Sequence, residues 1–184
     1  MESSLLRVAD FLGRINSPLA RRGRDAAAVL LAVMLAMALA QIVSRGLLHH
    51  SLGWAEELAR VALVWSVLLV APSAYRSGAN VAIVSFADAL PPRLLLVVSV
   101  LLNLLVLWIL LVLLNESFPL WRRGLDMTAA TLDLKLAWFY AIVPVSFAAM
   151  ALVGVELEIR LVLRLLGAKS GIVMEGAMPA VVEH

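Results

Sequence analysis

The chain has 184 residues, of which 63% are hydrophobic and 15% are charged, and its formal net charge is +2. A soluble domain is about half apolar and about a quarter charged, and a domain this small cannot hide the surplus apolar surface in one core, so that surface must face lipid. The absence of cysteine excludes disulfides, thiolate metal sites and cysteine nucleophiles. The basic residues flank apolar runs, which favours contact with anionic membrane lipid and excludes nucleic acid from the expected partners.

Residues 1–24 are expected to form a cytoplasmic tail that begins with an amphipathic helix. Ser3 and Ser4 can cap the start of this helix. Over residues 1–16, the charged side chains share one helix face and most apolar side chains share the opposite face. A helix of this kind suits the membrane surface, and a frayed tail is the open alternative.

Four apolar stretches predict four transmembrane helices, so the expected fold is an all-α membrane domain over residues 25–165. Three stretches carry no formal charge over 19 to 22 residues, and about 20 helical residues cross about 30 Å of hydrocarbon. The second stretch has a charge-free core of 15 residues and reaches span length if its first turns lie in the membrane interface. The expected spans are residues 26–44, 55–75, 94–115 and 136–156.

The placement of Lys and Arg predicts that both termini lie in the cytoplasm. Ten of these residues lie on the side of the termini, and five lie on the other side. Cytoplasmic loops carry the excess of basic residues in membrane proteins, so the expected topology is N-in and C-in. Residues 166–184 then form a second cytoplasmic tail, and residues 77–92 form a segment on the cytoplasmic membrane surface.

Small residues recur at four-residue spacing in the first span, at Ala28, Ala32, Ala36 and Ala40. Such a ladder lets helices approach closely in lipid. Alanine is also common in apolar helices generally, so a packing seam and chance remain equally open.

Aromatic and basic side chains near the ends of the third and fourth spans are typical of membrane-interface anchors. The residues expected at headgroup depth are Trp121, Arg122, Arg123 and Trp138.

The second span opens with a cluster of charges formed by Glu56, Glu57 and Arg60. On a helix, Arg60 lies four residues after Glu56 and three after Glu57, so its guanidinium can reach either carboxylate, and one acid remains in excess. An excess charge at the low-dielectric boundary marks a partner or an ion pathway. The competing interpretation is an interfacial ion pair that only ends the helix.

No ionisable side chain falls in the middle of a span, and the polar residues within the spans are few: Gln41, Ser66, Ser99, Asn103, Asn115 and Ser146. A complete ion-coupled carrier usually has ionisable groups or broken helices at that depth. Catalytic motifs for nucleotide, acyl-transfer and zinc-protease chemistry do not occur, and His49-His50 lacks the further ligands that zinc needs. The sequence therefore predicts a protein that is not an enzyme, without a catalytic, substrate-binding or metal site and without a cofactor.

Residues 54–60 read WAEELAR and are followed by Val64 and Trp65. This segment resembles the small membrane subunit of tripartite ATP-independent periplasmic (TRAP) transporters, whose second helix opens with W-x-E-E-x-x-R and a Trp shortly after. Residues 77–81 and 90–93 are similar to a second family motif, with Asn80 where the family usually has His. Residues 138–147 are similar to the aromatic entry and alanine-proline segment of the family's fourth helix.

This resemblance implies a non-catalytic partner of a much larger membrane subunit in the inner membrane of a bacterial or archaeal cell. In that family the large subunit carries the substrate and sodium sites and moves as an elevator. The small subunit braces the static scaffold, and a periplasmic substrate-binding protein delivers the solute, often an organic acid. The resemblance implies that the second helix is oriented at the subunit contact by Trp54, Glu56, Glu57, Arg60 and Trp65.

A self-assembling four-helix channel or holin-like protein is the alternative from a different functional class. In that case the alanine ladder would be the seam between identical chains.

Overall fold

The computed structural model describes residues 2–48, 53–77, 91–129, 131–132 and 134–166. Among these residues, four helices are long and apolar enough to cross a membrane, as the sequence predicts. The segment 78–90, the tail 167–184, His49-His50 and Asn80 lie outside the described residues.

The helices are α1 (Glu2–Val43), α2 (Gly53–Arg76), α4 (Pro92–Arg123), α5 (Leu136–Tyr140) and α6 (Ile142–Leu165), and a five-residue π-helix, η1 (Ser44–Leu48), continues α1. A short break at Ala141 separates α5 from α6. Pro144 accounts for this break, because proline has no N–H to donate to the carbonyl of Tyr140, four residues earlier.

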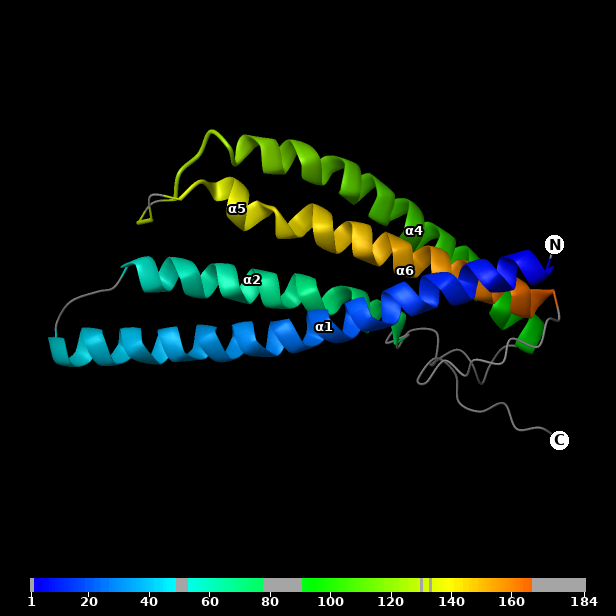
Figure 1. Ribbon diagram of the computed structural model, residues 1–184, viewed down its shortest axis with the longest axis horizontal. Coiled ribbons are helices and arrows are strands. Elements are labelled where there is room, and N and C mark those ends of the chain that lie inside the picture. Colours follow the sequence, from blue (N-terminus) through cyan, green and yellow to red (C-terminus); the bar gives the residue numbers. More distant parts are fainter. Residues whose placement is uncertain (1, 49–52, 78–90, 130, 133, 167–184) are drawn as a thin grey trace.

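The long helices form two antiparallel pairs. Helix α1 packs along α2, and α4 packs along α6, while α6 also contacts α1 and α2. Figure 1 shows that the two pairs meet at the end of the molecule that holds the N-terminus and separate toward the other end, where α5 lies. We call these the converging end and the diverging end.

Helix α1 is one continuous helix of 42 residues, about 63 Å long at 1.5 Å of rise per residue. The sequence predicts a separate surface helix and a tail before the first span, but no break occurs, and Pro18 lies inside the helix. The reason is packing: Ala9 and Ala20 are buried, and the site of a Cβ on Gly13 lies 2.7 Å from Nη2 of Arg160 on α6. The N-terminal half of α1 is thus held against α6, and its position at a membrane surface remains a prediction.

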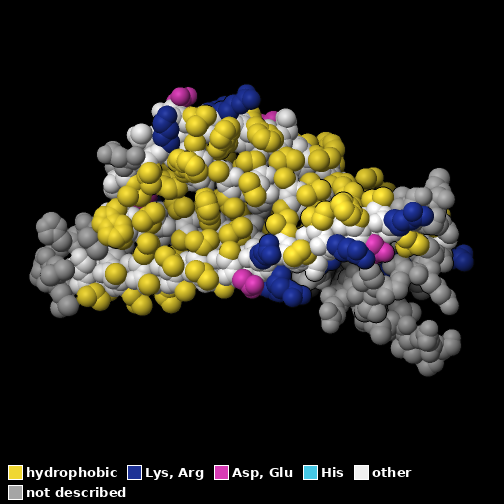
Figure 2. All heavy atoms as spheres, in the orientation of Figure 1, with side chains coloured by type: hydrophobic (Ala, Val, Ile, Leu, Met, Phe, Trp, Pro, Cys, Tyr) yellow, Lys and Arg dark blue, Asp and Glu magenta, His cyan; other side chains and the backbone are white. Residues whose placement is uncertain are grey.

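The apolar core lies where α2, α4 and α6 meet. Its buried members are Tyr75, Leu110, Val153 and Leu157. Most other large apolar side chains are exposed, and in Figure 2 they cover much of the visible face between the charged regions. An outer surface of this kind requires lipid or a partner protein to cover it.

The alanine ladder does not join helices within this chain. Ala28, Ala32, Ala36 and Ala40 are all exposed, and α1 buries Ala27 instead. The ladder therefore lies on the outer surface of the described bundle.

Candidate functional site

The charge cluster at the start of α2 lies at the diverging end. Arg60 forms an ion pair with Glu56, as the four-residue spacing predicts, and Gln41 on α1 donates to the same carboxylate group at 3.4 Å. The Arg60 and Glu56 side chains are 76% and 50% exposed. An exposed pair of this kind contributes at most about 1 kcal/mol to stability, so its main effect is to fix the direction of the two side chains.

Glu57 binds the loop that precedes α5. The backbone N–H of Thr131 donates to Oε2 of Glu57 at 3.0 Å, and the Thr131 hydroxyl donates to the same oxygen. Glu57 therefore connects the start of α2 to the loop before α5.

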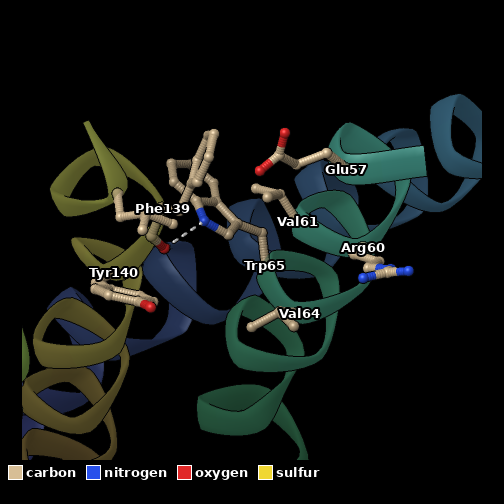
Figure 3. A pocket seen from close by; sticks show the side chains of 8 residues that line it. Glu57, Arg60, Val61, Val64, Trp65, Phe139 and Tyr140 are labelled. Atoms are coloured by element: carbon tan, nitrogen blue, oxygen red, sulfur yellow. Dashed lines mark hydrogen bonds between the residues drawn. The ribbon is translucent and has the colours of Figure 1, made fainter. Parts of the chain in front are cut away.

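Trp65 connects α2 to α5 one to two turns below this cluster. Its indole Nε1 donates to the carbonyl oxygen of Phe139 at 3.0 Å, as Figure 3 shows. An open groove of about 230 Å³ lies between the two helices; its walls are Glu57, Arg60, Val61, Val64, Trp65, Leu136, Phe139 and Tyr140. The structure thus gives Trp65 a contact within this chain and leaves the groove beside it open.

The other predicted interface residues lie on the surface. Trp54 is 45% exposed and Trp138 is 70% exposed, while Arg122 and Arg123 are exposed in the last turn of α4. Trp121 is half-buried beside them. Exposure at helix ends fits membrane-interface anchors, and the depth of these residues in the bilayer remains a prediction.

A second polar cluster lies at the converging end, around a buried carboxylate on α6. Glu156 is 2% exposed, and its Oε1 accepts from Nη2 of Arg160 at 2.9 Å and from Nη2 of Arg76 at 3.4 Å. Its Oε2 accepts from Nδ2 of Asn16 at 2.8 Å. We call Asn16, Arg76, Glu156 and Arg160 the polar hub, and it joins α1 and α2 to α6.

A neighbouring network extends these connections to α4. The Tyr75 hydroxyl donates to Oδ1 of Asn103 at 2.6 Å, and Nδ2 of Asn103 donates to Oε2 of Glu158 at 2.7 Å and to the carbonyl of Gly154 at 3.1 Å. Residues 154–160 of α6 thus connect to all three other long helices.

The sequence interpretation missed the polar hub. Arg160 lies beyond the predicted end of the fourth span at residue 156, but α6 continues to Leu165, and Arg160 is 8% exposed on its packed face. One signal was available: Glu156 and Arg160 have the same four-residue spacing as Glu56 and Arg60.

No group of three or more His, Cys, Asp or Glu side chains within the described ranges is placed to hold a metal ion. The two polar clusters instead join helices of the same chain. The fold and these clusters define a multi-pass, four-helix membrane protein whose buried polar groups hold its own bundle together.

Residues 24–164 match the family described as "Tripartite ATP-independent periplasmic transporters, DctQ component". The chain belongs to this family and is the small membrane component of a TRAP transporter, as the motif around residues 54–60 predicts. No curated protein matches the sequence.

Proposed function

We propose that this chain is the small scaffold subunit of a sodium-coupled, binding-protein-dependent TRAP transporter in the inner membrane of a bacterium or archaeon. In this role it braces the large elevator-type subunit during uptake of an organic acid or similar solute. A periplasmic binding protein delivers the solute, and this chain contacts neither solute nor sodium.

One observation carries the scaffold role: the buried polar side chains of the spans bond to helices of their own chain. Ser146 Oγ donates to the carbonyl of Leu68 at 2.7 Å, and Ser99 Oγ donates to the carbonyl of Leu95 at 2.8 Å. Asn103 bonds to α2 and α6. A site for an anionic substrate needs convergent donors, cations or helix N-termini at the bilayer midplane, so this use of polar groups favours a structural role.

The polar hub supports the same proposal, because it makes the bundle rigid. Glu156 and Arg160 are buried, and a carboxylate held by two guanidinium groups and an amide fixes the mutual position of three helices. A brace has to resist the motion of its partner, and a buried network with several bonds at one end of a bundle provides that resistance.

The proposal is tested by transport in liposomes that contain the large subunit, the binding protein and this chain. Omitting the chain should abolish uptake. Single substitutions of Gln41, Asn103, Asn115 and Ser146 by Ala or Leu should leave the half-saturating concentrations of substrate and sodium near wild type, with lower maximal rates where assembly weakens. A large shift in either constant, with the complex intact, would show that a ligand pathway runs through this chain.

The mass of the purified complex separates this function from a channel of identical chains. One copy of this chain with one much larger partner is expected. A ring that contains only this chain would contradict the scaffold role.

A further inference from the structure

We propose that the N-terminal half of α1 carries a docking surface for an amphipathic helix of the large subunit. This partner helix lies on the cytoplasmic side of the membrane and has acidic side chains beside its apolar face. The inference rests on the proposed function, because it takes the large subunit as the partner, and on the predicted cytoplasmic position of the termini. It adds where the partner docks on this chain and which charges the partner carries.

The N-terminal half of α1 has three rows of side chains along the helix. The first row is buried against the rest of the bundle: Ala9, Asn16 and Ala20. The second row is apolar and 44% to 63% exposed, and we call it the apolar stripe: Val8, Phe11, Ile15 and Leu19. The third row consists of exposed arginines at seven-residue spacing, and we call it the arginine row: Arg7, Arg14 and Arg21. Adjacent residues on a helix point about 100° apart, so the apolar stripe points away from the packed row and borders the arginine row.

The depth of the apolar stripe excludes lipid as its cover along the whole row. The charge-free run of the first span begins at Ala26, and α1 continues without a break through both segments. Phe11 lies about 22 Å before Ala26 along the helix at 1.5 Å of rise per residue. Even at a tilt of about 40°, Phe11 would lie about 17 Å beyond the hydrocarbon, whereas the headgroup layer is about 5–8 Å thick. Acyl chains therefore do not reach Phe11, and a protein surface is the complementary cover.

The spacing of the exposed side chains is typical of a surface that pairs with another helix. Val8, Phe11 and Ile15 follow the three-and-four spacing of the a and d positions of a heptad, and each residue of the arginine row then falls at a g position. In paired helices the a and d side chains pack on the partner, and charges at the g positions select it. The N-terminal half of α1 therefore presents both parts of a helix-pairing surface.

The charge of this surface indicates an acidic partner. Residues 7–24 hold five arginines and one acidic residue, Asp10. Figure 2 shows basic side chains spaced along α1 as the helix approaches the converging end. A second copy of this chain would bring like charges together, whereas Asp or Glu on the partner helix would complement the arginine row.

The first test is photo-crosslinking in membranes that contain this chain and the large subunit, with the crosslinking residue in place of Phe11. The expected product joins position 11 to a cytoplasmic segment of the large subunit that has Asp or Glu within one helical turn. Crosslinks to lipid alone would place the apolar stripe on the membrane surface and overturn the docking surface. Crosslinks to a second copy, within this chain, or to a segment without an acidic residue would overturn it as well.

The second test measures how much large subunit co-purifies with variants of this chain. Arg14→Gln should reduce recovery by up to about fivefold, as expected for the loss of one exposed ion pair, and Arg14→Glu should reduce it further. Phe11→Ser should also reduce recovery, because it removes apolar contact area. Arg24→Gln changes an exposed arginine of α1 outside the arginine row and should have no effect. The thermal unfolding midpoints of these variants should match wild type, because the substituted side chains are exposed, and this separates lost docking from lost folding.

Charge exchange provides the decisive result. Replacing the crosslinked Asp or Glu by Arg should restore the recovery that Arg14→Glu loses. Wild-type recovery with Arg14→Glu, or no restoration by the exchange, would overturn the docking surface while the scaffold role stands. If the wild-type chain recovers no large subunit at all, both the scaffold role and the docking surface are overturned.

Discussion

Asn16 donates a hydrogen bond from Nδ2 to Oε2 of Glu156 over 2.8 Å, and this bond joins side chains 140 positions apart in the sequence. The same carboxylate accepts from Arg160 and Arg76, so one buried acid on α6 holds α1 and α2. The connection explains why α1 continues as a helix through its N-terminal half. Most helical stability in proteins comes from tertiary packing, and the packing of the N-terminal half of α1 on α6 supplies it here.

Removal of the hub carboxylate should destabilise the bundle strongly. Glu156→Ala leaves Arg160 buried without its anion, and the loss of one member of a buried ion pair typically costs about 3–5 kcal/mol. The measurement is the thermal unfolding midpoint of the purified protein in detergent, together with its size-exclusion profile. Glu116→Gln, an exposed acid on α4, provides the matched control and should leave the midpoint unchanged.

The double variant tests whether the hub acts as a unit. Glu156→Ala with Arg160→Ala should be less destabilised than the sum of the two single variants, because the second change removes the unpaired charge that the first creates. Additive losses would show that the two side chains contribute separately.

A side chain at Gly23 should separate α1 from α2. A Cβ at this position would lie 2.7 Å from the carbonyl oxygen of Leu69, a backbone atom that cannot rotate away. We expect Gly23→Ala to lower stability by up to about 2 kcal/mol, because overpacking costs about 1–3 kcal/mol and alanine gains about 1 kcal/mol over glycine in a helix. Gly46→Ala meets nothing within 4 Å and should be neutral or stabilising, as judged by the same unfolding midpoint.

Substitutions of the two asparagines of α4 should differ sharply in their effect on the stability of the protein. Asn103 is 9% exposed and bonds to Tyr75, Gly154 and Glu158, whereas Asn115 is exposed. Asn103→Leu should cost about 1–3 kcal/mol, because it leaves buried polar groups without a partner, and Asn115→Leu should stay within about 0.5 kcal/mol of wild type. Equal effects in thermal unfolding would contradict the assignment of Asn103 to the network that joins α2, α4 and α6.

The fold was predictable from the sequence because lipid imposes a simple length rule. Three uncharged runs of 19 to 22 residues, and a fourth with a charge-free core of 15 residues, specify four spans whatever their packing. The ion pair of Glu56 and Arg60 was predictable for a related reason, since residues four apart on a helix face each other. Both inferences use local spacing alone.

Contacts between segments that are distant in the sequence could not be predicted from local spacing. Nothing in residues 1–24 indicates that Asn16 bonds to α6, because the bond depends on how α1 and α6 cross. The groove beside Glu57 likewise depends on where Trp65 bonds to α5. Helix packing in lipid follows from small residues and polar bonds at a few positions, and a sequence does not show which of its many small residues are used. The exposed alanine ladder and the packed Gly13 illustrate that ambiguity.

The last prediction concerns the orientation of the bundle in the membrane. Ten of the 15 Lys and Arg residues lie on the side of the termini, and cytoplasmic loops hold the excess of basic residues. The burial of Arg160 in the polar hub leaves this bias intact, because the hub itself lies at the converging end with the N-terminus (Figure 1). A reporter that is active only in the cytoplasm should therefore be active when fused after His184, and a reporter that is active only in the periplasm should be silent there. The same pair of reporters inserted in the loop after Arg123 should give the opposite result, which controls for expression. Activity of the periplasmic reporter at His184 would reverse the topology and place the groove beside Glu57 on the cytoplasmic side.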